Sequence, residues 1–216
     1  MEKTSYSLEE LVDPRHSTLI VVDMQNDFCH PDGAFAKRGS DISMVQRNGK
    51  ILADFITQAR NHGLLICHTQ DTHGKTDSPA WNHKHPMGGV CIDGTWGREF
   101  WEEHKEFTPL AHENVITKYR YCGFTNTRMD QVLRAHGIKT VILTGTTTET
   151  CVETTARGAY MRDYFLVIPQ DCVASPYEEY HRVTLQILGQ LWATVTTSHE
   201  IVKSWDRAKL PHALAK

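Results

Sequence analysis

Four short apolar runs, all rich in β-branched residues, divide the sequence. They are Ser17–Val22, Leu64–His68, Thr140–Thr144 and Tyr164–Pro169. Runs of this length without polar alternation are typical of central parallel strands that are buried on both faces. Two weaker runs, Asn114–Lys118 and Ala193–Thr197, are expected to complete the sheet.

Helical spacing of apolar residues fills the segments between these strands. The predicted helices are Ile42–His62, Thr127–His136, Cys151–Arg162 and Tyr177–Trp192. Strands that alternate with helices of this length predict an α/β fold, a three-layer, doubly wound parallel sheet of six strands flanked by helices. We expect a single domain over residues 1–216, because no repeat, low-complexity tract or linker divides the chain.

Composition and charge narrow the class of protein. The chain has 23 basic and 26 acidic residues and a net charge of −3, which gives no support for a nucleic-acid partner. No uncharged apolar run approaches the roughly 18 residues of a membrane helix, and the N-terminus lacks the apolar segment of a secretory signal. The six cysteines form no CxxC pair. Free thiols and a cytoplasmic location are therefore expected, rather than a disulfide scaffold or a disulfide oxidoreductase.

Three residues that could carry chemistry stand at or near predicted strand ends. Asp23 follows the first strand, Lys118 ends the Asn114–Lys118 run, and Cys151 follows the strand TVILTG through a turn. Since the carboxyl ends of parallel strands meet at one edge of a sheet, we expect these side chains to converge there.

Cys151 is the candidate nucleophile. We predict that it opens a helix, whose N-terminal partial charge would stabilise the thiolate and lower the cysteine pKa. Asp23, at the edge of a dry site, is expected to have a raised pKa and to transfer the thiol proton. Lys118 would hold Asp23 ionised or stabilise the thiolate and an oxyanion. Taken singly, each has a structural alternative: a buried apolar cysteine, a strand-end cap and a solvated lysine.

Three blocks of sequence resemble the isochorismatase-like, or cysteine hydrolase, superfamily. They are LIVVDMQNDF, ITKYRYCGFTNTRMDQVLRAHGIKTVILTGTTTETCVETTARGAYMRDY and VIPQDCVAS, within about Ser17 to Trp205. The resemblance implies an Asp–Lys–Cys catalytic triad at Asp23, Lys118 and Cys151, and an oxyanion hole from the backbone N–H groups of Thr147 and Cys151. It also implies a non-proline cis peptide at Thr146–Thr147 and a homodimer or homotetramer.

Within this superfamily, the block from Tyr119 to Asp130 is most similar to ureidoacrylate and N-carbamoylsarcosine amidohydrolases. That similarity implies a small-molecule amide or ureido substrate, whose C–N bond is cleaved with release of ammonia or an amine. Isochorismatases, which cleave a vinyl ether, typically lack the cysteine. The expected substrate-binding residues, for which core packing is the alternative, are Phe28, Gln70, Trp81, Tyr121, Phe124 and Asn126.

Nicotinamidases of the same superfamily carry a metal site built from an Asp-x-His pair and two further histidines. The sequence offers Asp71-Thr72-His73, followed by His83 and His85. The surrounding consensus of the third ligand is missing, so no cofactor is expected. The alternative is a zinc or similar divalent ion on Asp71, His73 and His85. A non-catalytic binding protein with the same fold is a further alternative.

Overall fold

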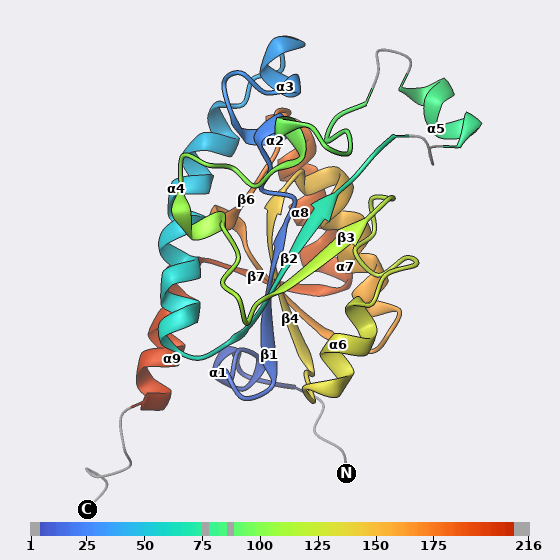
Figure 1. Cartoon of the computed structure of the whole chain (residues 1–216). Helices are drawn as coiled ribbons and strands as arrows, with labels where there is room; N and C mark the ends of the chain where they lie inside the picture. Colours follow the sequence, from blue (N-terminus) through green and yellow to red (C-terminus); the bar gives the residue numbers. More distant parts are fainter. Residues whose placement is uncertain (1–4, 75–77, 86–88, 210–216) are drawn as a thin grey trace, which may run out of the picture.

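A parallel β-sheet forms the centre of the computed structural model, which describes residues 5–74, 78–85 and 89–209 (Figure 1). Its strands are β1 (Ser17–Val22), β2 (Leu65–Asp71), β3 (Asn114–Lys118), β4 (Thr140–Thr146), β5 (Phe165–Pro169), β6 (Val173–Ala174) and β7 (Ala193–Thr196). The order is β3-β2-β1-β4-β5-β7, and β6 pairs with the end of β4. The predicted parallel α/β fold is confirmed. The two-residue β6 is an addition to the six predicted strands, because a segment so short carries no periodicity.

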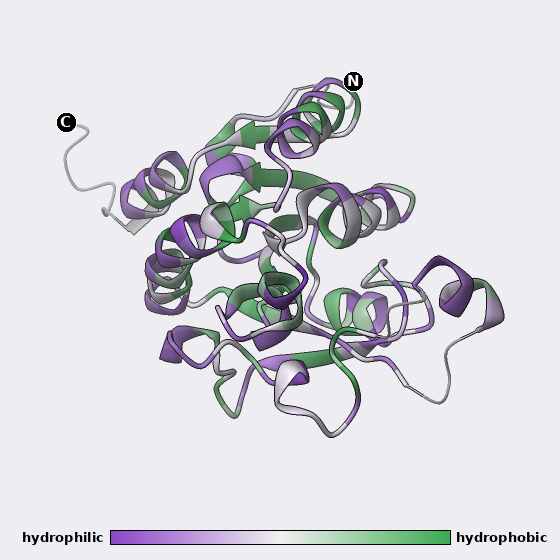
Figure 2. Cartoon of the chain, turned by 90° about the horizontal axis from the view of Figure 1, so that it is seen from above, coloured by the Kyte–Doolittle hydropathy of each residue, from purple (hydrophilic) through white to green (hydrophobic). Residues whose placement is uncertain are grey.

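Helices cover both faces of this sheet (Figure 1). One face is covered by α1 (Leu8–Leu11), α4 (Ser43–Asn61) and α9 (Ser198–Lys209), and the other by α6 (Met129–Ala135), α7 (Glu153–Tyr160) and α8 (Glu178–Leu191). Seen from above, the strands carry the hydrophobic colour between the helix layers (Figure 2). None of the helices in the described part of the chain is both long and apolar enough to span a membrane.

The central strand β1 shows why the apolar runs do not alternate. Leu19 and Val21 belong to the core beneath α4, whereas Ile20 and Val22 belong to the core beneath α6 and α7. All six residues of β1 are buried, because both faces of the strand are covered.

Short helices gather above the carboxyl ends of the strands. They are α2 (Asn26–Cys29), α3 (Ala34–Lys37) and α5 (Pro79–Lys84). Two predicted elements change here. β2 continues to Asp71 rather than ending at His68, and the helix predicted from Cys151 is a π-helical turn, η3 (Thr148–Val152), followed by α7. Cys151 therefore lies inside a wide turn and does not open a regular helix.

A buried charge network joins α4 to β2 and to the segment that enters β3. Glu113 accepts hydrogen bonds from Arg60 Nε at 2.8 Å and contacts His68 Nε2 at 3.0 Å. Burial would raise the pKa of Glu113, but its bonds to His68 and Arg60 outweigh it and lower the pKa to about 2. Burial lowers the pKa of His68. The network therefore favours an ionised Glu113 beside a neutral His68.

The free energy of unfolding is expected to fall as the pH falls from about 4.5 towards 2, because Glu113 binds a proton more readily in the unfolded chain. Protonation of His68 acts in the same direction, since its pKa is lowered in the folded protein. Glu113→Gln is expected to cost about 3 kcal/mol at pH 7 and to flatten the acid limb of the stability curve. Urea denaturation across this pH range measures both effects, with the exposed Glu179→Gln as control. An unchanged acid limb in Glu113→Gln would contradict the prediction.

Candidate active site

A cavity of about 400 Å³ opens at the carboxyl edge of the sheet. Its wall is formed by Phe28, Phe35, Arg38, Ser40, Asp71, Trp81, His85, Gly89, Val90, Tyr121, Thr147, Glu149, Thr150, Cys151, Pro176 and Tyr177. The cavity therefore combines aromatic rings with a few polar groups and a thiol, as in sites for small molecules.

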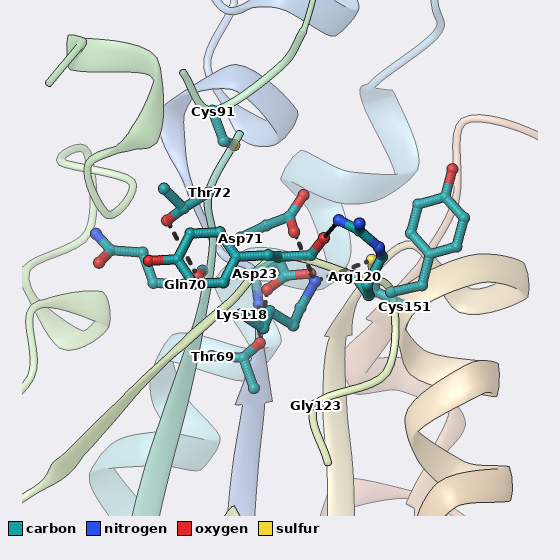
Figure 3. Close-up of polar contacts among 12 residues, drawn as sticks. Asp23, Thr69, Gln70, Asp71, Thr72, Cys91, Lys118, Arg120, Gly123 and Cys151 are labelled. Carbon is teal, nitrogen blue, oxygen red and sulfur yellow. Dashed lines mark hydrogen bonds and ion pairs between the residues drawn. The ribbon is translucent and has the colours of Figure 1, made fainter. Parts of the chain in front are cut away.

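Lys118 is the centre of the polar contacts beside this cavity (Figure 3). Its Nζ lies 2.8 Å from Asp23 Oδ2, 3.0 Å from Asp71 Oδ1 and 3.5 Å from Cys151 Sγ. Asp23 and Lys118 are fully buried, and Cys151 is 5% exposed. The predicted convergence of Asp23, Lys118 and Cys151 is confirmed, and Asp71 joins them.

The register of the sheet places these side chains together. Asp71 and Lys118 are partners across β2 and β3, so both side chains leave the sheet at the same level. Asp23 follows β1 directly and has a φ of 50°, a conformation that non-glycine residues rarely adopt. The Thr69 hydroxyl accepts a hydrogen bond from the Asp23 N–H at 3.1 Å and donates one to Asp23 Oδ1 at 2.6 Å. Thr69 therefore fixes the direction of the Asp23 carboxylate.

The Gln25 side chain links β1 to β2 beyond the last backbone pairing of the two strands. Its Oε1 accepts a hydrogen bond from the Asp71 N–H at 2.8 Å, and its Nε2 donates to the Asp71 carbonyl at 2.9 Å. This side chain satisfies the Asp71 backbone and holds Asp71 in place beside Lys118.

The two carboxyl groups beside Lys118, those of Asp23 and Asp71, have pKa values shifted in opposite directions. Burial raises the pKa of Asp23, although Lys118 opposes this. Burial also acts to raise the pKa of Asp71, but the charges of Lys118 and His73 prevail and lower it. Burial would lower the pKa of Lys118, whereas Asp23, Cys151 and Asp71 hold it well above its usual value. The ionised form of Asp71 is therefore favoured beside Lys118, whereas burial disfavours the ionised form of Asp23.

Cys151 differs from the prediction in its ionisation. Burial raises the pKa of the Cys151 thiol well above its ordinary value, and the nearby Lys118 only partly opposes this. The expected lowering at a helix N-terminus is thus wrong, because Cys151 is buried within η3. The implied cis peptide at Thr146–Thr147 is present, and Thr147 lines the cavity with Cys151. All six cysteines are free, as predicted.

Gly145 allows β4 to approach β1 at this edge. Its φ is +101°, and a Cβ at this position would overlap the Val22 carbonyl oxygen. Only glycine combines this backbone conformation with such a close approach. The turn that carries Thr147 and Cys151 is thereby held against the strand that carries Asp23.

Three of the six predicted substrate-binding residues line the cavity, namely Phe28, Trp81 and Tyr121. Trp81 packs against Tyr121 with their ring centroids 5.0 Å apart. The Tyr121 hydroxyl is hydrogen-bonded to His85 Nε2 at 2.9 Å. Trp81, His85 and Tyr121 therefore form an aromatic wall between α5 and the segment after β3.

The other three lie away from the cavity, so their expected position was wrong. Gln70 alternates with Thr69 and Asp71 along β2, and its amide donates to the Arg98 carbonyl at 3.2 Å, away from Lys118 (Figure 3). Phe124 is buried in the core against Tyr164. Asn126 is exposed in a turn with a φ of 55°.

The residues considered for a metal site do not fit one in their present arrangement. His73 Nε2 bonds Asp71 Oδ2 at 2.8 Å, and Asp71 is also paired with Lys118. The Trp81 indole packs against both His73 and His85, with centroid distances of 4.3 and 4.4 Å. Among the described residues, no group of three His, Cys, Asp or Glu side chains is arranged to hold an ion.

Several polar side chains of the site were missed by sequence reasoning. Asp71 was considered only as a metal ligand, and Thr69, Gln25 and Glu149 were not singled out. Asp71 carried a detectable signal, because it follows the predicted strand Leu64–His68 by three residues, near the sheet edge where strand ends meet. Glu149 is two residues before Cys151, but nothing in the sequence shows which way its side chain points.

Known proteins share the fold of this chain. The isochorismatase domain matches residues 17–200. A cysteine hydrolase from Pseudomonas syringae pv. phaseolicola 1448A has a similar fold, with a TM-score of 0.82 at 23% identity over 95% of this chain and 100% of that chain.

Two further solved structures have names that state an activity. An N-carbamoylsarcosine amidase from Thermoplasma acidophilum is 29% identical, with a TM-score of 0.70 over 85% of this chain and 96% of that chain. A pyrazinamidase of Pyrococcus horikoshii, in complex with zinc, is 26% identical, with a TM-score of 0.70 over 84% and 99%. Because the matched domain spans residues 17–200 of 216, the chain belongs to the isochorismatase family.

Proposed function

We propose that this protein hydrolyses the C–N bond of a small amide or ureido compound, with Cys151 as nucleophile and Asp23 as the proton carrier. The observation that carries the proposal is the position of Lys118 Nζ, within 3.5 Å of the thiol and of both carboxylates beside one cavity. The amidase names of two family relatives support a C–N bond as the target.

The first half-reaction begins with a neutral thiol, since burial raises the pKa of Cys151. Asp23 accepts the thiol proton as Sγ attacks the substrate carbonyl carbon, because a carboxylate with a raised pKa is suited to this exchange. Asp23 then gives the proton to the leaving nitrogen. Ammonia or an amine departs, and the acyl group stays on Cys151.

Lys118 and the turn before α7 stabilise the charges that develop. Lys118 keeps its proton, so its positive charge offsets the thiolate and the carboxylates throughout. The N–H groups of Thr147 and Cys151 are the proposed donors to the oxyanion. In the second half-reaction, Asp23 takes a proton from water as the water oxygen attacks the acyl carbon. The C–S bond then breaks, the acid leaves, and Asp23 returns the proton to Sγ, which restores the thiol.

The test is an ammonia-release assay with a panel of amides, in the presence and absence of a chelator. The panel contains ureidoacrylate, N-carbamoylsarcosine, biuret, nicotinamide and short aliphatic amides. We expect chelator-insensitive turnover of at least one compound. Rapid acid quench and intact-mass analysis should then detect an acyl adduct on Cys151.

Each contrary result points to a different alternative. Turnover of nicotinamide that a chelator abolishes would favour a zinc-dependent amidase and a rearranged Asp71, His73 and His85. Binding of panel compounds without turnover would favour a non-catalytic binding protein. Turnover that persists after alkylation of Cys151 would overturn the proposed nucleophile.

A further inference from the structure

Glu149 brings a second, separate carboxylate to the cavity wall. It lies in η3, two residues before Cys151, and lines the same cavity. Its Oε2 is buried and has no hydrogen-bond partner among the described residues. A buried acceptor without a donor costs free energy, which a donor from a bound molecule would recover.

Ser175 lies on the other side of this carboxylate. Burial raises the pKa of Glu149, and the Ser175 hydroxyl acts in the opposite direction. Ser175 is buried, follows β6, and also accepts the Tyr177 N–H at 2.9 Å. The pairing of β6 with β4 thus fixes the position of the residue beside Glu149. Oε2 of Glu149 is left for a partner.

Two groups of side chains flank the strand β4 that leads to Cys151. Asp23, Asp71 and Lys118 come from β1, β2 and β3, which lie on one side of β4 in the sheet. Ser175 follows β6, which pairs with β4 on its other side. The leaving nitrogen must face Asp23 to receive its proton. The part of the substrate that remains on sulfur is therefore directed towards Glu149.

We propose that Glu149 is a specificity residue that accepts a hydrogen bond from an N–H of the retained part of the substrate, and that it thereby selects ureido compounds over simple carboxamides. This proposal rests on the amidohydrolase function proposed above. A ureido group carries such an N–H on the reacting carbonyl carbon, whereas an aliphatic or aromatic carboxamide carries carbon there.

Hydrolysis of a ureido substrate can be written in two balanced steps that use only Cys151, Asp23 and water. The thiol of Cys151 and R–NH–CO–NH₂ give R–NH–CO–S–Cys151 and ammonia, with the thiol proton carried by Asp23. Water then gives R–NH–COOH and the free thiol. The carbamic acid loses carbon dioxide in solution and leaves R–NH₂. The N–H that faces Glu149 stays on the retained group through both steps.

The test uses two substrates of the same shape, N-ethylurea and butyramide, which differ by NH in place of CH₂. For each enzyme we would measure the ratio of kcat/KM for the urea to that for the amide, so that the intrinsic reactivities cancel. We expect Glu149→Leu to lower this ratio about 30-fold. Glu149→Gln, which keeps a neutral acceptor oxygen, should lower it less, and Glu179→Gln on exposed α8 should leave it unchanged.

The outcomes separate the two proposals. Equal losses on both substrates, or an unchanged ratio in both Glu149 variants, would overturn the role of Glu149 and leave the amidohydrolase function intact. The same holds if the wild-type protein cleaves butyramide but not N-ethylurea. If neither substrate is cleaved and no compound of the wider panel forms an adduct on Cys151, both proposals fail. Should Glu149→Leu not fold, Glu149→Gln is expected to lower the ratio in the same direction.

Discussion

Replacing Cys151 by alanine is expected to lower kcat/KM for every amide substrate by a factor on the order of 10⁴ or more, without loss of the fold. The Cys151 sulfur is the only group proposed to bond to the substrate carbon, so its loss leaves binding and the oxyanion donors but no acyl transfer. Removing one buried sulfur costs only about 1 kcal/mol of stability. Ammonia release and thermal unfolding measure the two effects separately.

A matched variant distinguishes the nucleophile from a merely buried thiol. Cys172 is also free and buried, and burial raises its pKa as well, but it does not line the cavity. Cys172→Ala should keep most of the activity while losing a similar amount of stability. Cys151→Ser should be nearly as inactive as Cys151→Ala, because a hydroxyl holds its proton more tightly than a thiol. More than one hundredth of the wild-type rate in Cys151→Ala would contradict the prediction.

The strands were predictable because their residues are apolar on both faces. The same signal failed where buried residues are polar, as at the end of β2, which was predicted to stop at His68 and continues to Asp71. Thr69 and Asp71 are buried there because Asp23, just after β1, and Lys118, on β3, pair with them. Hydropathy along one segment cannot detect a partner that is distant in sequence.

The convergence at the sheet edge was predictable for a different reason. Parallel strands place their carboxyl ends together, so residues that follow strands meet there without any knowledge of side-chain contacts. Residues in the connections do not obey this rule. Phe124, six residues after Lys118, lies in the core beside Tyr164, whereas Tyr121 faces the cavity. Nothing in the order of these residues distinguishes the two positions.

Replacing Lys118 by methionine is expected to lower both activity and stability by large factors. Methionine fills a similar volume but leaves Asp23 and Asp71 buried without the cation that lies 2.8 and 3.0 Å from them. Removing one partner from a buried ion pair costs about 3–5 kcal/mol. Turnover should fall on the order of 10³-fold, because the thiolate and the oxyanion lose the cation that lies 3.5 Å from Cys151 Sγ.

The pH dependence of this loss has a definite sign. Without Lys118 the pKa values of both carboxyl groups rise in the folded protein, so the folded variant binds protons more readily than the unfolded chain. Its free energy of unfolding should then increase as the pH is lowered from about 8 to 5, opposite to the acid limb caused by Glu113. Urea denaturation at both pH values measures this, with the exposed Lys139→Met as control.

The double variant Lys118→Met/Asp71→Asn separates stability from catalysis. It removes one of the two unpaired carboxylates, so at pH 8 it should recover much of the stability lost in Lys118→Met. It should remain inactive, since neither change restores a positive charge beside Cys151 Sγ. A variant that regained both stability and turnover would mean that Lys118 only offsets the buried carboxylates. A Lys118→Met protein as stable as the wild type at pH 8 would show that the ion pairs contribute no net stability.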